Sequence, residues 1–213
     1  MSYGVDNKTA YPPPGQTVGS LEPEDPITDN DATSEYVMNH VMLRIKDPKP
    51  TLDFYVKLLG MRTIFTTNSG AFSVYYLGYP KKLEHRADPA AYARDTKDPE
   101  VLTRTPGLLE LCHYHGSENN PNFEISTGAR PPHLGFNHLG FTVPDVKIAV
   151  ERFRKAGVKI VKDVGQGPVE GIPSTRWERE ELGISTGTLS AGFSNIVEQM
   201  AFIEDPVSSL CTK

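Results

Sequence analysis

Cysteine is scarce in this chain, since only Cys112 and Cys211 occur among 213 residues. So few cysteines indicate a reducing compartment rather than a secreted, disulfide-built protein. The chain also lacks any apolar run approaching the roughly 20 residues that span a bilayer. The first ten residues, MSYGVDNKTA, show no cationic and then apolar leader pattern. We therefore expect a cytoplasmic protein that has no membrane partner.

Positive charge is also in short supply, with 22 Lys and Arg against 27 Asp and Glu. Residues 1–35 contain one lysine and seven acidic residues, so the rest of the chain is nearly neutral. A neutral body lacks the basic stripe that nucleic-acid binding needs and the polybasic patch that anionic membranes attract. We expect a small-molecule substrate and no nucleic acid.

The N-terminal segment has few apolar side chains. Its stretch YPPPGQTVGSLEPEDPITDND holds five prolines and several acidic residues. Such a composition cannot bury enough surface to offset the entropy of an ordered chain. We expect residues 1–31 to be a disordered, acidic, proline-rich tail.

An internal repeat is the most informative feature that is present. NHVMLRIKD at residues 39–47 recurs as NHLGFTVPD at residues 137–145, an offset of 98. Each copy is followed by an amphipathic stretch, KPTLDFYVKLLGM in the first half and VKIAVERFRKAGV in the second. Their apolar residues fall at helical spacing, and each stretch contains a glycine where a helix would end. Each half of the chain therefore begins with a strand and then a helix.

The remainder of each half is typical of strands. RTIFTT, FSVYYLGY and GLLELCHY are rich in β-branched, aromatic and leucine residues. The second half offers VKIVKD and, after a long excursion over residues 165–195, IVEQMAFIED. The pattern predicts an α+β fold of two βαβββ modules. The expected segments are a first module over 32–125 with a polar insertion over 81–106, a linker over 126–136, and a second module over 137–213 with a lid-like insertion over 165–195 and a truncated last strand.

Three side chains could form a metal site. His40 and His138 begin the two copies of the repeat, and each shares a strand face with the residues two positions apart. Glu110 lies between Leu109 and Leu111, so its carboxylate should point away from the helix-covered side. Two imidazoles and a carboxylate suit a borderline ion such as Zn, Ni, Co or Fe(II). A structural duplication without a metal stays open, because a lone strand histidine is more often a hydrogen-bonded structural residue.

Four segments resemble a known family: HVMLRIKDPKPTLDFYVKLLGM, LLELCHYHGSE, GFNHLGFTVPDV and AFIEDP. They are similar to glyoxalase I (lactoylglutathione lyase) of the vicinal oxygen chelate superfamily, over about residues 31–206. The resemblance implies two βαβββ modules that make a U-shaped mixed sheet around a metal. It also implies a homodimer with its sites at the subunit interface.

The resemblance assigns roles to individual residues. It places the metal ligands at His40, Glu110 and His138, with Zn or Ni as the expected ion and Co or Fe as further possibilities. It makes Glu110 the catalytic carboxylate as well, and it gives Arg44 a carboxylate of glutathione to bind. A glutathione adduct is therefore the implied substrate.

Several positions depart from the family pattern. Tyr114 and Leu134 stand where the family has an asparagine and an arginine that contact glutathione. AFIEDP aligns with the penultimate strand, so residues 207–213 should supply at most a short edge strand. That alignment puts Thr212 where the family has a fourth ligand, a glutamate. Glu198 in NIVEQM is the other carboxylate that could take this place, although that would leave AFIEDP unassigned.

The implied reaction is the metal-dependent isomerisation of the hemithioacetal of methylglyoxal and glutathione to S-lactoylglutathione. Without a fourth carboxylate, Glu110 would serve as both base and ligand. Two alternatives remain open at this point. One is a non-haem iron dioxygenase or another enzyme of the same superfamily, because two histidines and a carboxylate also describe an oxygen-activating site. The other is a catalytically impaired protein that binds a small molecule.

Overall fold

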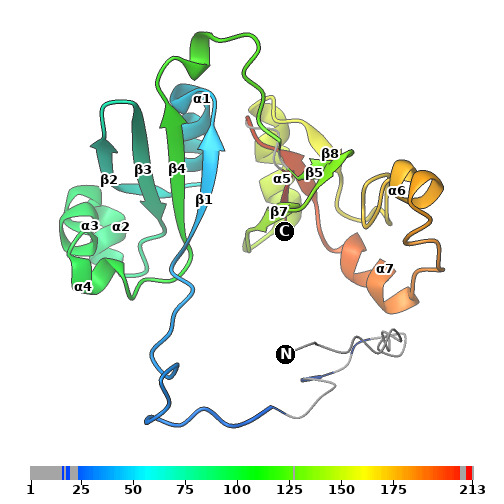
Figure 1. Cartoon of the computed structure of the whole chain (residues 1–213), viewed down its shortest axis with the longest axis horizontal. Helices are drawn as coiled ribbons and strands as arrows, with labels where there is room; N and C mark the ends of the chain where they lie inside the picture. The colour runs from blue at the N-terminus through cyan, green and yellow to red at the C-terminus, as the bar shows by residue number, and fades with distance from the viewer. Residues whose placement is uncertain (1–15, 17, 20–23, 127, 207–209, 213) are drawn as a thin grey trace, which may run out of the picture. The chain divides into compact units, whose positions relative to one another are not determined.

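The computed structural model describes residues 16, 18–19, 24–126, 128–206 and 210–212, the last three by their backbone alone (Figure 1). Most of the expected tail over residues 1–31 lies outside the described residues. The chain divides into two compact units. One comprises residues 35–164 and 200–213, and the other comprises residues 1–34 and 165–199.

The first βαβββ module forms a four-stranded mixed sheet. Its strands are β1 (His40–Ile45), β2 (Arg62–Asn68), β3 (Phe72–Gly78) and β4 (Leu108–Tyr114), in the order β1-β4-β3-β2 (Figure 1). β1 and β4 are parallel, whereas the other two pairs are antiparallel. The crossover between β1 and β2 is helical, with α1 (Pro48–Leu52) continuing into the π-helical segment η1 (Asp53–Leu58).

The crossover helix follows from local sequence. Asp47 precedes it, and the carboxylate of Asp47 accepts a hydrogen bond from the Lys49 backbone N–H. This satisfies one of the free donors at the helix start, and Pro48 suits the first helical position. Gly60 has a φ of 81°, a left-handed conformation that ends the helix before β2. The expected strand and helix of this half are thus confirmed.

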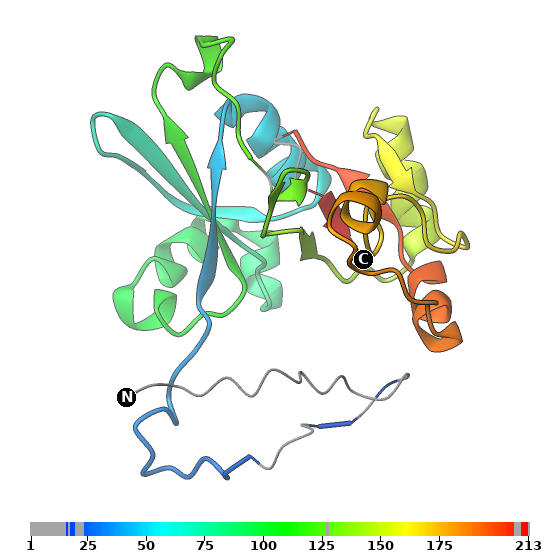
Figure 2. The same cartoon turned by 45° about the vertical axis from the view of Figure 1, so that its right-hand side comes forward.

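The polar insertion contains three short helices: α2 (Leu83–Ala87), α3 (Pro89–Thr96) and α4 (Pro99–Leu102). Asp88 and Asp98 cap α3 and α4, each just before a proline at the first helical position. The repeated Asp-Pro pair was therefore a readable helix-start signal. Figures 1 and 2 show these helices at the end of the sheet where β1 begins.

The second module repeats the same topology in a second four-stranded sheet. Its elements are β7 (His138–Gly140), α5 (Val146–Lys155), β8 (Ile160–Lys162), β9 (Phe202–Glu204) and β10 (Leu210–Thr212), with the strand order β7-β10-β9-β8. Asp145 caps α5 as Asp47 caps α1, by accepting from the Ile148 N–H. The α+β class with two βαβββ modules is therefore confirmed.

The segment between the modules is not a plain linker. The range expected for the linker, 126–136, contains a small hairpin of β5 (Ala129–Arg130) and β6 (His133–Leu134), and the short 3-10 helix η2 (Ser117–Asn119) precedes it within the range expected for the first module. Residue 127 lies outside the described residues. Arg130 on this hairpin forms an ion pair with Glu204 on β9, which ties the hairpin to the second module.

Two features of the second module differ from expectation. Residues 196–198 of IVEQMAFIED belong to helix α7 (Ala191–Glu198), because the Ser190 hydroxyl accepts from the Phe193 N–H and starts a helix there. Only residues 202–204 form the strand. β10 is short, as expected, but it is an inner strand rather than an edge strand. It pairs in parallel with β7 and antiparallel with β9.

The unit that holds α7 also contains α6 (Arg176–Glu181). Thr175 and Glu178 form a capping box at its start, in which each side chain bonds the backbone N–H of the other residue. Neither helix is long and apolar enough to cross a membrane, and the same holds for every helix in the described part of the chain.

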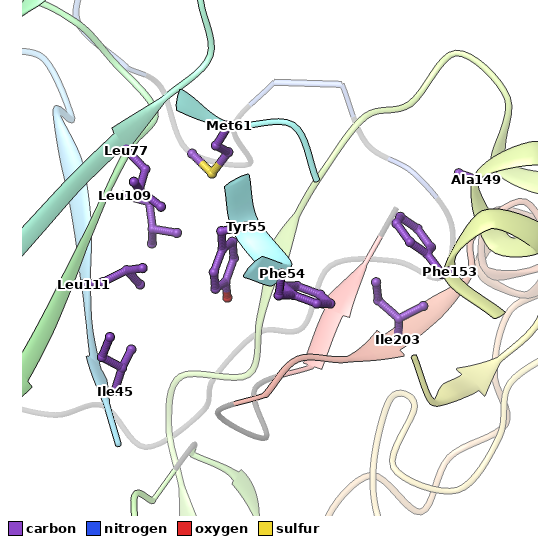
Figure 3. Close-up of a cluster of buried hydrophobic side chains, with 10 residues drawn as sticks. All are labelled: Ile45, Phe54, Tyr55, Met61, Leu77, Leu109, Leu111, Ala149, Phe153 and Ile203. Carbon is purple, nitrogen blue, oxygen red and sulfur yellow. The ribbon is translucent and has the colours of Figure 1, made fainter. Parts of the chain in front are cut away.

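The core of the larger unit joins the two modules (Figure 3). Phe54 and Tyr55 on η1 stand between the two halves of the cluster. On one side they face first-module residues such as Leu109 and Leu111, and the other half includes Ile203. The expectation that Leu109 and Leu111 face the helix-covered side is confirmed. The remaining members of the cluster are Ile45, Met61, Leu77, Ala149 and Phe153.

A buried polar contact accompanies this core. The Tyr55 hydroxyl donates a hydrogen bond to Asp205 Oδ2 at 2.6 Å, and both residues are at least 95% buried. Tyr55 belongs to the first module and Asp205 directly follows β9, so the bond links the modules. A buried carboxylate is costly unless it is hydrogen-bonded, and this partner satisfies one of its oxygens.

Candidate metal-binding site

One face of the first sheet carries the candidate site. Along β1, His40, Met42 and Arg44 are exposed, while Ile45 is buried on the opposite face. Met42 is paired with Glu110 of β4, and paired residues in neighbouring strands share a face. Glu110 therefore lies on the same face as His40, as the period-2 pattern predicts.

His40 and Glu110 are in direct contact. His40 Nε2 lies 3.3 Å from Glu110 Oε2, and Glu110 is the more buried of the two, with a side chain 17% exposed. The Tyr76 hydroxyl donates a hydrogen bond to the same carboxylate oxygen at 2.7 Å and lies 3.5 Å from His40 Nε2. Three polar atoms from β1, β3 and β4 thus meet at one point.

Tyr76 is a site residue that the sequence analysis did not identify. Burial raises the pKa of its phenol to about 12, and the hydrogen bond to the Glu110 carboxylate adds to this effect. The phenol therefore keeps its proton and remains a donor at ordinary pH. A signal was present, because FSVYYLGY forms the strand beside GLLELCHY. The register pairs Tyr76 directly with Glu110, but only the assembled sheet gives this register.

The pair fits a divalent cation. The Nδ1 atom of His40 lies 2.8 Å from Asn39 Oδ1, so Nδ1 is the donor, and Nε2 carries a lone pair whenever the ring holds a single proton. A lone pair and a carboxylate oxygen that face each other require a proton or a metal ion between them. Ligands bound at about 2.0–2.2 Å in adjacent positions lie about 3.0–3.5 Å apart. The separation of 3.3 Å agrees with this spacing.

His138 begins β7 in the second module, where it is exposed. Its ring lies near Phe202, with centroids 6.2 Å apart, and its Nδ1 lies 2.8 Å from Asn137 Oδ1. The structure does not bring His138 to the pair formed by His40 and Glu110. Among the described residues, no three His, Cys, Asp or Glu side chains gather where they could hold one metal ion. Two of the three expected ligands therefore meet within one chain.

The two modules can be compared through their strand registers. β1 pairs His40 with Leu108 and Met42 with Glu110. β7 pairs His138 with Leu210 and Gly140 with Thr212. Thr212 thus occupies the register position in β10 that Glu110 occupies in β4. AFIEDP supplies β9, the penultimate strand, as the preferred alignment predicts. Glu198 ends helix α7 and belongs to no strand.

Arg44, the residue expected to bind a carboxylate, is exposed on β1 beside an aromatic ring. Its guanidinium carbon lies 5.3 Å from the centre of the Tyr114 ring, a cation–π contact that leaves the side chain exposed. Tyr114 also packs against Phe72, with ring centroids 5.7 Å apart. Tyr114 therefore gives the Arg44 guanidinium an aromatic surface to rest against. Leu134 is exposed on β6.

Cys112 shares the site face with Glu110 but is not an activated thiol. Its pKa is raised, first by burial and then by the Glu110 charge, and the Arg44 charge only partly opposes this rise. The thiol is 5% exposed. A buried thiol with a raised pKa holds little thiolate, so Cys112 acts as a core residue.

These observations define an α+β protein of two βαβββ modules with an imidazole–carboxylate pair on an exposed sheet face. Residues 37–175 match the model of the Glyoxalase/Bleomycin resistance protein/Dioxygenase superfamily. The chain belongs to this superfamily, and the resemblance described from the sequence is confirmed.

The chain is also similar in sequence to individual proteins of known name. The chain is 40% identical over 137 residues to a lactoylglutathione lyase of Pseudomonas aeruginosa, covering 63% of this chain and 73% of the relative. It is 35% identical over 194 residues to glyoxalase I of Saccharomyces cerevisiae, covering 85% of this chain and 56% of the yeast protein. Among solved structures, the trypanothione-dependent glyoxalase I of Leishmania major gives a TM-score of 0.46 at 19% identity, covering 83% of this chain and 84% of that one.

Proposed function

We propose that this protein is a cytoplasmic lactoylglutathione lyase, which converts the hemithioacetal of methylglyoxal and glutathione to S-lactoylglutathione. The observation that carries the proposal is the contact between His40 Nε2 and Glu110 Oε2 on the face that also holds Arg44. The family and the 40% identical lactoylglutathione lyase support the same reaction.

His40, Glu110 and His138 would hold a divalent ion, with zinc or nickel preferred and cobalt or iron as further candidates. Imidazole nitrogen and carboxylate oxygen are ligands that all of these ions accept. When bound, the ion supplies Lewis-acid chemistry, because it polarises substrate oxygens and stabilises the negative charge that builds up during proton removal.

The protein groups move and hold the proton. Glu110 removes the proton from C1 of the substrate and returns it to C2, and the proton of the C1 hydroxyl passes to the C2 oxygen, which together convert the hemithioacetal to the thioester of lactate. The Tyr76 hydroxyl fixes Oε2 of the same carboxylate and so orients Glu110. Arg44 binds a carboxylate of the glutathione portion, held in place by the Tyr114 ring beneath it.

We propose that the third ligand comes from a second copy of the chain. His40 and Glu110 lie on the first sheet, and the described residues of one chain offer no third ligand beside them. We propose a homodimer in which His138 of one subunit completes the pair on the other. A closed two-fold dimer would then contain two equivalent sites. Within each subunit we propose a first module over 32–125, a linker over 126–136 and a second module over 137–213.

A second candidate function has one observation in its favour. Thr212 occupies in β10 the register position that Glu110 occupies in β4. A hydroxyl cannot replace a carboxylate as a base without an activating partner. The site would then resemble the two-histidine, one-carboxylate arrangement of oxygen-activating iron enzymes, or it would bind the substrate without rapid turnover.

The deciding experiment measures metal content and hemithioacetal isomerisation in purified protein and in Glu110→Gln. We expect a stoichiometric metal and isomerase activity in the wild type, and a loss of activity of about 10²–10⁴-fold in the variant. Glu118→Gln is the matched control, because Glu118 also contacts a histidine of this module, at 2.9 Å from His113. Metal-bound wild-type protein without isomerase activity would contradict the proposal, and oxygen uptake would then favour the second candidate.

A further inference from the structure

Both candidate histidines make the same contact with the residue before them. Asn39 Oδ1 lies 2.8 Å from His40 Nδ1, and Asn137 Oδ1 lies 2.8 Å from His138 Nδ1. The Asn-His pair is one of the few identities that the two copies of the repeat retain. The same contact between an asparagine and the following histidine therefore occurs twice, once in each sheet.

The direction of the hydrogen bond is fixed at the first pair. The Asn39 amide nitrogen donates to the carbonyl oxygens of Leu102 and Thr105, both at 2.7 Å. A flipped amide would place its oxygen against those two carbonyl oxygens and leave no donor there. The Asn39 oxygen must therefore face His40 and accept the Nδ1 proton.

This bond determines which ring nitrogen can bind a metal. A neutral imidazole carries one proton, so a proton held on Nδ1 leaves the lone pair on Nε2. Nε2 is the atom that lies 3.3 Å from Glu110 Oε2. The opposite tautomer would direct an N–H at the metal position. The ring is also held against rotation, because the bond to Asn39 anchors its other side.

We propose that Asn39 and Asn137 are positioning residues that fix the tautomer and ring orientation of His40 and His138 for metal binding. This inference rests on the proposed function, because it presumes that both histidines are ligands. It adds a role for the helical insertion. Leu102 ends α4 and Thr105 lies just beyond it, so the insertion over 81–106 orients Asn39 and through it the ligand His40.

The test uses the Asn→Leu change at each position, which preserves side-chain size and removes the acceptor. Zinc affinity is measured on metal-free protein by competition with a chromogenic chelator, with no substrate present. Loss of a hydrogen bond to a ligating histidine lowers metal affinity by about 10–100-fold, and we expect this loss in both Asn39→Leu and Asn137→Leu. Asn68→Leu is the control, because the Asn68 side chain accepts a local bond from the Gly70 N–H in the β2–β3 turn, away from both histidines.

Conservative variants separate positioning from general destabilisation. Asn137→Asp keeps an acceptor for His138 and should restore affinity to within about threefold of wild type, because a carboxylate also serves as a partner for a ligating histidine. Asn39→Asp should not restore it, because its carboxylate would face the Leu102 and Thr105 carbonyl oxygens. Equal rescue at both positions would overturn the role of the insertion.

A spectroscopic measurement gives a second readout. In metal-free wild type, the ¹⁵N shifts of His40 and His138 should show a protonated Nδ1 and an unprotonated Nε2 at a pH where the rings are neutral. Asn137→Leu should show a mixture of tautomers at His138 only. If Asn39→Leu fails to fold, Asn137→Leu still decides the matter.

The outcomes distinguish this inference from the proposed function. If wild-type protein binds no zinc, nickel, cobalt or iron, the proposed function fails first. If wild type binds zinc and both Leu variants bind it within twofold of wild type, the positioning role is overturned while the proposed function stands. Unchanged histidine tautomers in the Leu variants would also overturn it.

Discussion

A site assembled from two copies of the chain can be tested by mixing two variants that each lack one part of it. The first variant carries His40→Ala and Glu110→Gln, and the second carries His138→Ala. Each homodimer should lose its metal sites. In the first, every site lacks His40 and Glu110, and in the second, every site lacks His138. The prediction follows from the placement of His40 and Glu110 on the first sheet without a third ligand beside them in the described part of the chain.

The expected recovery can be worked out from the two-fold symmetry. When the two variants are co-refolded in equal amounts, about half of the dimers are mixed. Each mixed dimer has one site that combines all of the substitutions and one site that is entirely wild type. The mixture should therefore recover about one quarter of the wild-type sites. Both the metal content per chain and the hemithioacetal isomerase rate should rise to this fraction.

The assay compares metal content and turnover in each variant alone, in the co-refolded mixture, and in a mixture made without refolding. His133→Ala is the matched control, because His133 is exposed on β6 outside the site and should leave metal content unchanged. No recovery after verified formation of mixed dimers would refute the shared site. Full metal retention by His138→Ala alone would refute the role of His138 as a ligand.

Three further predictions concern recognition and stability. Arg44→Ala should raise KM for the glutathione adduct by about 10–100-fold, because a hydrogen bond to a charged group contributes about 1.5–3 kcal/mol, and it should leave metal content unchanged; an equal loss of metal would make Arg44 structural. Tyr55→Phe should lower the free energy of unfolding in urea by about 1–3 kcal/mol, because it removes a donor from a buried carboxylate, and an unchanged midpoint would contradict this. The Glu204 pKa is lowered, first by a hydrogen bond from Lys159 and then by the charges of Lys159 and Arg130. Its stabilising effect is therefore present above the pKa of the unfolded chain and lost as pH falls through the lower folded value, so Glu204→Gln should reduce the acid loss of stability below the ordinary glutamate pKa of about 4.3. If the free energy of unfolding falls equally with acid in the wild type and in Glu204→Gln, that reasoning is wrong.

In the two insertions, local sequence is sufficient to specify several helices. Asp88-Pro89 and Asp98-Pro99 start α3 and α4 by local hydrogen bonds, and Ser190 starts α7 in the same way. N-caps act within one turn of chain, so these helices could have been predicted from the sequence alone. IVEQMAFIED was predicted as a strand throughout, because a short apolar run has no periodicity that separates a strand from a buried helix end.

The sequence alone determined the architecture and the part of the site that lies on the first sheet. Copies of Asn-His followed by an apolar strand and a capped helix specify two βαβββ modules, and the period-2 alternation places His40, Arg44 and Glu110 on one face. These are properties of short segments, which the chain encodes locally. Tyr76, the contact of Asn39 with Leu102 and Thr105, and the separation of His138 from the first pair depended on strand register and module packing. Only the tertiary structure decided them, because they join residues that are from 34 to 66 positions apart or lie on different sheets, and no local pattern records such distances.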